Sequence, residues 1–133
     1  MNITSRIKRS IRNRSELVFR PADFQPFGSE ASVKRALKEL TDIGLLVRLG
    51  VGIYAKAKPS VISGKPIPIQ PLEVIGPQAL TKLGVRLKES RQTTEYNAGR
   101  STQVPTGIVV NIGKQRVSRK IGFNGKFITY EHA

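Results

Sequence analysis

The sequence predicts an α+β protein in which a winged helix-turn-helix domain is followed by a small α+β domain with a short antiparallel sheet. Apolar residues recur at helical spacing twice in the first third of the chain, and short β-branched runs between glycine-containing turns occur in both halves. A proline-rich stretch, PSVISGKPIPIQP, separates the two sets. The expected domains are therefore residues 1–58 and 72–133, and residues 59–71 are expected to form a stiff, extended linker.

The longest helix of the first domain is expected between Gly28 and Gly44. Apolar side chains from Val33 to Leu40 recur at i, i+4 and i+7, so one stripe of this helix faces a core. The opposite face is polar and basic, and serines stand at the start of the helix. This combination is typical of a helix that enters the major groove of DNA, and it predicts five DNA-binding residues: Ser29, Ser32, Lys34, Arg35 and Lys38. The alternative interpretation is a solvated cationic face.

A basic hairpin is predicted directly after that helix. Short strands over residues 46–49 and 53–58 flank Gly50-Val51-Gly52, whose glycines suit a tight turn. Arg48 on the first strand and Lys56 on the second are expected near DNA phosphates. Winged helices also serve as protein-docking modules, so the hairpin by itself leaves the partner open.

Three further elements complete the predicted first domain. A helix over residues 3–13 has isoleucines at i, i+4 and i+8, with Arg9 and Arg12 on the polar side. Both arginines are predicted to reach flanking phosphates, and a solvated face is again the alternative. A short strand at residues 17–19 is expected to pair with the hairpin, and Pro21 is expected to open a second helix.

The second domain is predicted to combine one helix with three strands. The helical pattern runs over residues 72–83, and Gly76-Pro77 predicts either a kink or a helix that starts only at Pro77. Residues 92–106 are expected to form a loop, and residues 85–87 a short strand. The three sheet strands are expected at residues 108–112, 115–121 and 126–130, with Asn124-Gly125 as the hairpin turn before the last.

Cations of the second domain supply a candidate partner-binding surface. The four residues predicted to bind a partner are Arg116, Arg119, Lys120 and Lys126. They would lie along a small open sheet, where at least one strand edge is unpaired. The edge is expected to dock a second copy of the chain or an acidic patch on another protein. The alternative is that these cations only protect the edge from aggregation.

Charge is the strongest compositional signal. The chain has 23 Lys and Arg against 9 Asp and Glu, a net charge of +14, which favours a polyanionic partner: nucleic acid first, an anionic membrane surface second. The charge divides evenly, with 12 − 5 = +7 in residues 1–58 and 11 − 4 = +7 in residues 59–133. There is no apolar run of ~20 residues, so no membrane span is expected. Cysteine is absent, which excludes disulfides and is consistent with a cytoplasmic location.

Catalytic chemistry is not expected. The single histidine, His132, is next to the last residue, and the acids of the second half have no evident reason to meet. Neither phosphate-binding loops, nucleophile elbows nor metal-ligand spacings occur. The sequence therefore predicts a protein that is not an enzyme and has no cofactor and no metal.

The chain resembles a known family over nearly its whole length. The segments that carry the resemblance are ITSRIKRSI, VFRPADF, GSEASVKRALKEL, GLLVRLGVGIYAKAK and EYNAGRSTQVP. They are similar to the short AbiEi-like proteins, winged-helix antitoxins of type IV toxin–antitoxin systems. The resemblance implies a cytoplasmic autoregulator that binds double-stranded DNA at its own promoter. It also implies that the C-terminal part neutralises a nucleotidyltransferase-like toxin.

Two other functions remain open alongside this one. The chain could be a stand-alone transcriptional regulator of a mobile element, in which residues 72–133 form a homodimer or extend the DNA contact. It could also bind RNA with the same charge. Exposed aromatic side chains would favour RNA, because single-stranded bases stack on them.

Overall fold

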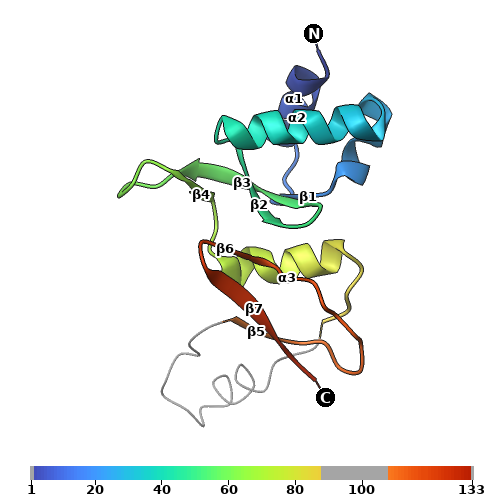
Figure 1. The fold of residues 1–133 in the computed structure, drawn as a ribbon, viewed down its shortest axis with the longest axis vertical. Helices are drawn as coiled ribbons and strands as arrows, with labels where there is room; N and C mark the ends of the chain where they lie inside the picture. Colours follow the sequence, from blue (N-terminus) through green and yellow to red (C-terminus); the bar gives the residue numbers. More distant parts are fainter. Residues whose placement is uncertain (1, 88–107, 133) are drawn as a thin grey trace. The chain divides into compact units, whose positions relative to one another are not determined.

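The structure, a computed structural model, describes residues 2–87 and 108–132 and is a mixed α+β fold, as the sequence predicts (Figure 1). Residues 92–106, expected as a loop, lie outside the described residues. In chain order the elements are α1 (Ile3–Asn13), β1 (Val18–Phe19), the 3-10 helix η1 (Pro21–Phe27), α2 (Glu30–Asp42), β2 (Leu46–Gly50), β3 (Ile53–Pro59), β4 (Pro66–Pro68), α3 (Leu72–Lys82), β5 (Ile108–Asn111), β6 (Gly122–Phe123) and β7 (Lys126–Glu131).

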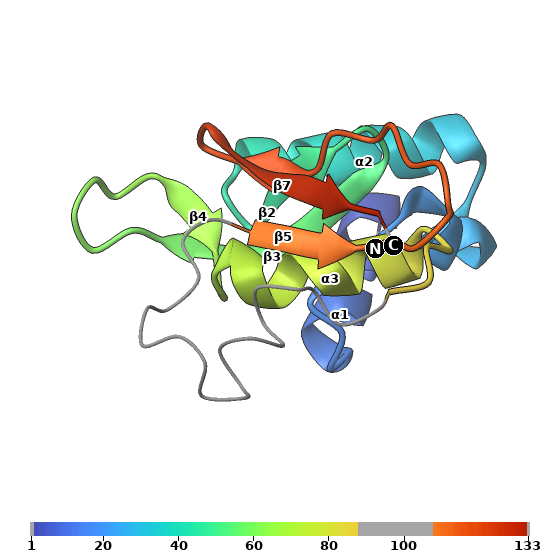
Figure 2. The same ribbon diagram turned by 90° about the horizontal axis from the view of Figure 1, so that it is seen from below.

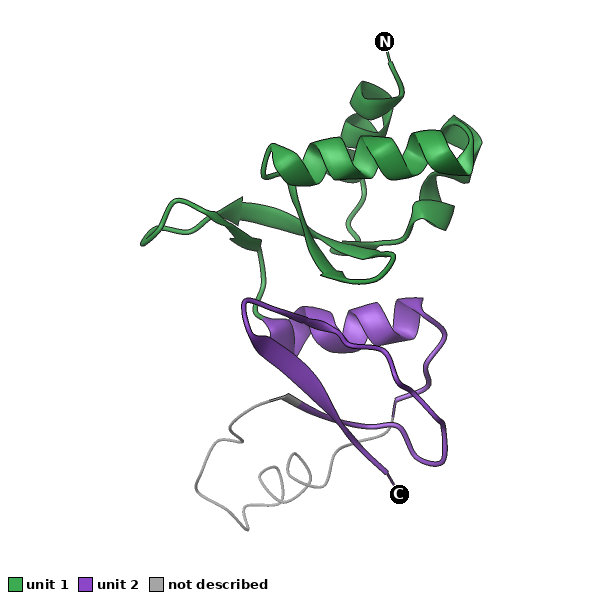
Figure 3. Ribbon diagram, viewed as in Figure 1, with its two compact units in different colours: residues 1–71 green, residues 72–133 purple. Residues whose placement is uncertain are grey.

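The chain divides into two compact units, Met1–Pro71 and Leu72–Ala133 (Figure 3). The second unit begins where the second domain was expected. The expected linker, residues 59–71, instead belongs to the first unit, because β4 pairs antiparallel with the end of β3. Within that unit, Ile69 N–H donates to Lys56 O at 3.0 Å and Ser60 N–H to Lys65 O at 2.8 Å.

Proline does not prevent this pairing because of its positions along β4. The N–H groups that face β3 come from alternate residues such as Ile69, so the N atoms of Pro66 and Pro68 point away from the ladder. An edge strand tolerates proline there, since no ladder bond is lost. The alternation of proline with isoleucine, read from sequence as an extended linker, is therefore the pattern of an edge strand.

The sheet of the first unit has the order β1-β3-β2. β4 also pairs with β3, on the same edge as β1 but further along the strand. Val18 and Val47 both pair with Ala55, one from each side. The predicted short strand therefore does pair with the hairpin. β2 and β3 are antiparallel, with a register shift between Arg48 and Gly50 at the tip.

The helices of the first unit bury one continuous core against this sheet. Phe19 of β1 and Phe24 of η1 are both fully buried, with ring centroids 5.8 Å apart. Each such buried side chain stabilises the fold by about 1.5–3 kcal/mol. The core residues are Ile7, Ile11, Phe19, Phe24, Val33, Ala36, Leu37, Leu40 and Leu46, which confirms the apolar stripes predicted for both α-helices.

The second helix of the first unit is a 3-10 helix. Asp23 Oδ2 accepts a bond from Arg20 N–H at 2.8 Å, which fixes the first turn after Pro21 as predicted. Pro26 lies inside the segment, and its missing N–H prevents a regular α-helical ladder. The chain then passes through Gly28 into α2.

In the second unit, α3 starts at Leu72 and runs through Gly76-Pro77. Of the two alternatives predicted for this segment, the helix that starts only at Pro77 is therefore wrong. Proline in a helix interior costs about 3 kcal/mol. Leu72 and Ile75, which precede Pro77 in the helix, are both buried, and two such side chains offset that cost at about 1.5–3 kcal/mol each. Helical spacing therefore outweighs the helix-breaking residue.

The sheet of the second unit is mixed, not purely antiparallel. β7 lies in the middle, with β5 parallel on one side (Figure 2). β6 is antiparallel on the other side, and α3 contacts both β5 and β6. The β6–β7 hairpin turns at Asn124 and Gly125, which both have positive φ (56° and 85°) as expected for this dipeptide. That hairpin occupies one edge of β7, so β5 pairs with the other edge.

Two predicted strands are absent from the described part of this unit. Residues 115–121 form an irregular segment, with only Gly122–Phe123 adding a short strand after it, and residues 85–87 are also irregular. The side chain of Gln115 joins the two segments: its Nε2 donates to Arg86 O at 2.5 Å, and its Oε1 accepts from Arg86 N–H at 3.1 Å. A side-chain amide thus takes the place of a strand ladder.

Candidate nucleic-acid interface

The N-terminal end of α2 is built as the sequence predicts. Ser29 is the N-cap residue, and its Oγ accepts a bond from Ser32 N–H at 3.2 Å. The two hydroxyl groups are also 2.9 Å apart and hydrogen-bonded. Ser29 is exposed and Ser32 half-buried. Both hydroxyls are therefore held at the start of the helix, close to its free N–H groups.

Two of the α2 cations are engaged in ion pairs along their own helix. Lys34 Nζ lies 2.9 Å from Glu30 Oε1, and Lys38 Nζ lies 3.2 Å from Asp42 Oδ2. Lys34 lowers the pKa of Glu30, chiefly through its hydrogen bond and then through its charge. Exposed pairs of this i,i+4 type contribute little to stability, because solvent screens them. Each lysine can therefore exchange its carboxylate for a phosphate at low cost.

Arg35 differs from these lysines. Its exposed side chain makes no ion pair with any residue that the structure describes. It lines a hollow of about 200 Å³ between α1 and α2, together with Ser32 and Thr4. Glu39, one turn further along α2, accepts a bond from Thr4 Oγ1 at 2.6 Å. The guanidinium thus remains available on the face that begins at the serine cap.

One cation near this face was missed from the sequence. The Arg6 guanidinium lies 5.4 Å from the centroid of the Phe27 ring, at the end of η1. Gly28, the next residue, approaches Ile3 of α1 so closely that a Cβ atom would lie 2.6 Å from Ile3 Cδ1. The start of α1 therefore packs on the turn before α2. Sequence spacing indicated which face of α1 is apolar, but not that Arg6 meets this turn.

The remaining predicted DNA-binding residues fall in different places. Arg9 is exposed on α1. Arg48 is exposed on β2, and its Nε donates to Gly50 O at 3.2 Å beside the hairpin tip. Arg12 and Lys56 instead line one cavity with Lys8, and this cavity shares no residue with the hollow that Arg35 lines. Arg12 and Lys56 are therefore placed around a different cavity from the hollow beside Arg35.

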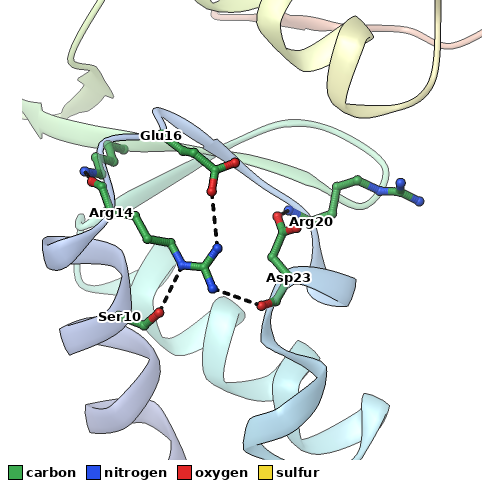
Figure 4. Close-up of polar contacts among 6 residues, drawn as sticks. Ser10, Arg14, Glu16, Arg20 and Asp23 are labelled. Atoms are coloured by element: carbon green, nitrogen blue, oxygen red, sulfur yellow. Dashed lines mark hydrogen bonds and ion pairs between the residues drawn. The ribbon is translucent and has the colours of Figure 1, made fainter.

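Arg14, which the sequence did not single out, is fixed at the junction of α1, β1 and η1. Its guanidinium donates to Ser10 Oγ at 3.1 Å, to Glu16 Oε1 at 3.2 Å and to Asp23 O at 3.3 Å (Figure 4). It also lies 5.3 Å from the centroid of the Phe24 ring. Each nitrogen of its guanidinium thus has a protein partner, and Arg14 joins α1 to the segment before β1 and to η1.

All four predicted partner-binding cations of the second unit are exposed. Lys120 Nζ lies 5.2 Å from the centroid of the Phe127 ring, and Lys126 Nζ lies 3.7 Å from Glu73 Oε1. Arg116 and Arg119 belong to the irregular segment before β6, and Tyr130 Oη donates to Arg119 O at 2.6 Å. These cations lie on a tethered loop and on one strand, and not along a strand edge as predicted.

Two further features are absent from the described residues. They hold no cluster of three or more His, Asp or Glu side chains that would suit a metal ion. None of the helices in residues 2–87 and 108–132 has the length and apolarity that a membrane span requires.

Comparison with known proteins assigns the chain to one family. A family described as a family of unknown function, DUF6088, matches residues 2–133, and the chain belongs to it. Neither the curated proteins nor the solved structures contain a significant match.

Proposed function

We propose that this DUF6088 protein is a winged helix-turn-helix regulator that binds double-stranded DNA through α2. The proposal is supported by the order helix, short strand, 3-10 helix, helix and hairpin, and by the sheet order β1-β3-β2. The carrying observation is the exposed face of α2, where a serine cap precedes Arg35, a cation without an ion pair among the described residues.

The proposed contacts follow from the chemistry of each side chain. Arg35 is a planar donor that can bind the O6 and N7 edges of guanine at once. Ser29 and Ser32 present hydroxyl groups at the helix start, where phosphate oxygens also bind free N–H groups. Lys34 and Lys38 exchange their weak carboxylate partners for phosphates. Arg6 beside the turn and Arg48 beside the hairpin tip supply further phosphate contacts; Arg9 remains a flanking candidate.

The distribution of aromatic side chains favours DNA over RNA. Phe127 of the second unit is the exposed large aromatic residue of the described chain, and Lys120 already lies over its ring. In the first unit, Phe19 and Phe24 are buried in the core, and Phe27 and Tyr54 pack against it. Single-stranded nucleic acid is bound by stacking its bases on exposed aromatic rings, and the described residues of the first unit offer no such platform.

A toxin-neutralising role for the second unit is part of the same proposal. It has its support in the exposed cations at Arg116, Arg119 and Lys120, which suit an acidic partner, whether a nucleotidyltransferase-like toxin or a second copy. Its residues carry 10 cations and 4 anions over Leu72–Ala133, a net charge of +6. A stand-alone regulator that lacks a toxin partner would use the same surface for self-association.

The test is a binding assay with the full chain and three nucleic acids at one salt concentration. Duplex DNA from the region upstream of its own gene is compared with random duplex and with structured RNA. Specific DNA-binding proteins prefer their site by about 10³-fold or more, so the upstream duplex is expected to bind that much more tightly than random duplex. Equal affinity for all three would reduce the protein to a nonspecific polyanion binder, and a preference for RNA would replace the proposal.

A further inference from the structure

The first unit contains a cavity of about 250 Å³ that the proposed DNA contacts do not use. Its apolar lining comes from both α-helices and the sheet and includes Ile11 of α1, Leu40 of α2, Ala57 of β3 and Ile69 after β4. Ile11 and Leu40 are also members of the core, so the cavity opens directly onto the apolar interior. A polar ligand alone would leave this surface unmatched.

Three cations lie around that apolar surface: Lys8 and Arg12 of α1, and Lys56 of β3. Lys8 and Arg12 are one helical turn apart and therefore point to the same side of α1. No carboxylate lines the cavity, and neither Lys8 nor Arg12 forms an ion pair with any described residue. The cavity thus combines an apolar lining with uncompensated positive charge.

The β3 wall of the cavity is fixed by hydrogen bonds on both sides. Lys56 N–H donates to Leu17 O at 2.9 Å, and Ile69 N–H donates to Lys56 O at 3.0 Å. On the other side, Ala57 N–H donates to Leu45 O at 3.1 Å. Small-molecule sites are generally preformed cavities of this kind, mostly apolar with a few fixed polar groups.

We propose that this cavity binds a small amphipathic carboxylate, an aromatic or short aliphatic acid. An apolar cavity of about 150 Å³ holds benzene, so about 250 Å³ accommodates a single ring or a short chain with its carboxylate. The apolar part contacts Ile11, Leu40 and Ile69, and the carboxylate accepts charge-assisted bonds from the lysine and arginine groups. Binding requires no DNA, so the proposal is independent of the function proposed above.

The experiment is an amide NMR titration of the full chain with paired probes. Benzoate and hexanoate are compared with benzyl alcohol and hexanol, which keep the apolar part and lose the charge, and with inorganic phosphate, which keeps only charge. Shifts are expected at the amides of Ile11, Leu40, Ala57 and Ile69. The acids are expected to bind about tenfold more tightly than the alcohols, since one lost charge-assisted bond is of this order.

Substitutions distinguish the cavity from general attraction to a basic protein. Lys8→Gln is expected to weaken benzoate and hexanoate binding about tenfold. Arg9→Gln, the matched control on the same helix outside the cavity, is expected to leave binding unchanged. Ala57→Leu fills the cavity and is expected to abolish the shifts, and the remaining amide spectrum reports whether that variant is folded.

Three results would overturn the proposal. If the alcohols bind as tightly as the acids, the cations around the cavity do not contribute to binding. If phosphate binds as tightly as benzoate, the apolar lining does not contribute and the cavity binds anions in general. Equal losses in the Lys8 and Arg9 variants, or shifts elsewhere in the chain, would exclude this cavity as the site.

Discussion

Lys56 Nζ donates a hydrogen bond to the carbonyl oxygen of Arg14 at 2.5 Å, across 42 positions of sequence. The acceptor is the C-cap residue of α1, whose last carbonyl groups have no partner within the helix. A lysine at this end also interacts favourably with the helix dipole. Lys56, predicted to contact DNA, thus has a structural partner between β3 and α1.

Lys56→Gln is therefore expected to destabilise the protein by about 1–2 kcal/mol, because a hydrogen bond from a charged group is lost. The measurement is urea unfolding of the full chain. Lys58→Gln is the matched control, since Lys58 lies two residues along the same strand and is exposed. A Lys56 variant as stable as the control would contradict the structural role.

Arg35→Ala is expected to cost about 1–3 kcal/mol of DNA affinity, concentrated at one base pair of the site, because a bidentate base contact is lost. Lys38→Ala is expected to weaken binding evenly across sequences. Competition with single-base variants of the upstream duplex separates the two effects. If both variants bind like the unmodified protein, α2 does not lie in the groove.

Salt dependence gives a count of phosphate contacts. Lys34, Lys38, Arg6 and Arg48 are proposed to neutralise phosphates, so log K is expected to fall with log salt at a slope of about −0.9 for each one. Each single alanine variant should make this slope shallower by about 0.9, the value for one phosphate contact. An Arg14 variant that kept its fold but lost one contact would place Arg14 on the DNA, against the geometry described above.

Replacing Arg116, Arg119 and Lys120 by Glu is expected to abolish self-association or toxin neutralisation and to leave operator affinity in the first unit nearly unchanged. Sedimentation measures self-association. Toxin neutralisation is measured as rescue of growth in cells that express a candidate nucleotidyltransferase-like toxin. Rescue with an unaltered oligomeric state would contradict a docking role for this surface. Loss of operator binding alone would assign these cations to the DNA.

Tyr130 provides a pH-dependent readout of the second unit. Burial raises the pKa of its phenol above the usual 10.0, and Arg119 opposes the shift. Because the folded state favours the neutral phenol, its contribution is fully present below the unfolded pKa and is lost as pH rises through the higher folded pKa. Tyr130→Phe should remove the late step of an ultraviolet titration and cost about 0.5–1 kcal/mol, the hydrogen bond to Arg119 O.

The sequence by itself determined the elements whose cause is local. The apolar spacing of α1 and α2, the Ser29 cap and the Asn124-Gly125 turn depend on residues a few positions apart, and all were predicted. The same locality identified the basic face of α2, since helical periodicity alone separates Arg35 from the Val33 stripe.

Only the tertiary structure decided which distant groups meet. Period-two alternation does not say whether a strand is parallel or antiparallel. β5 therefore pairs parallel with the edge of β7 that the hairpin leaves free, and the proline-rich segment pairs as β4 with a free part of the β3 edge. Likewise, composition marks Lys56 and Arg12 as cations, but only packing places them around an apolar cavity with Lys8, apart from Arg35. The backbone carbonyl that Lys56 contacts and the cavity that Lys56 and Arg12 line have no sequence signature. Both form only when the chain folds, so these two side chains could not be placed from sequence.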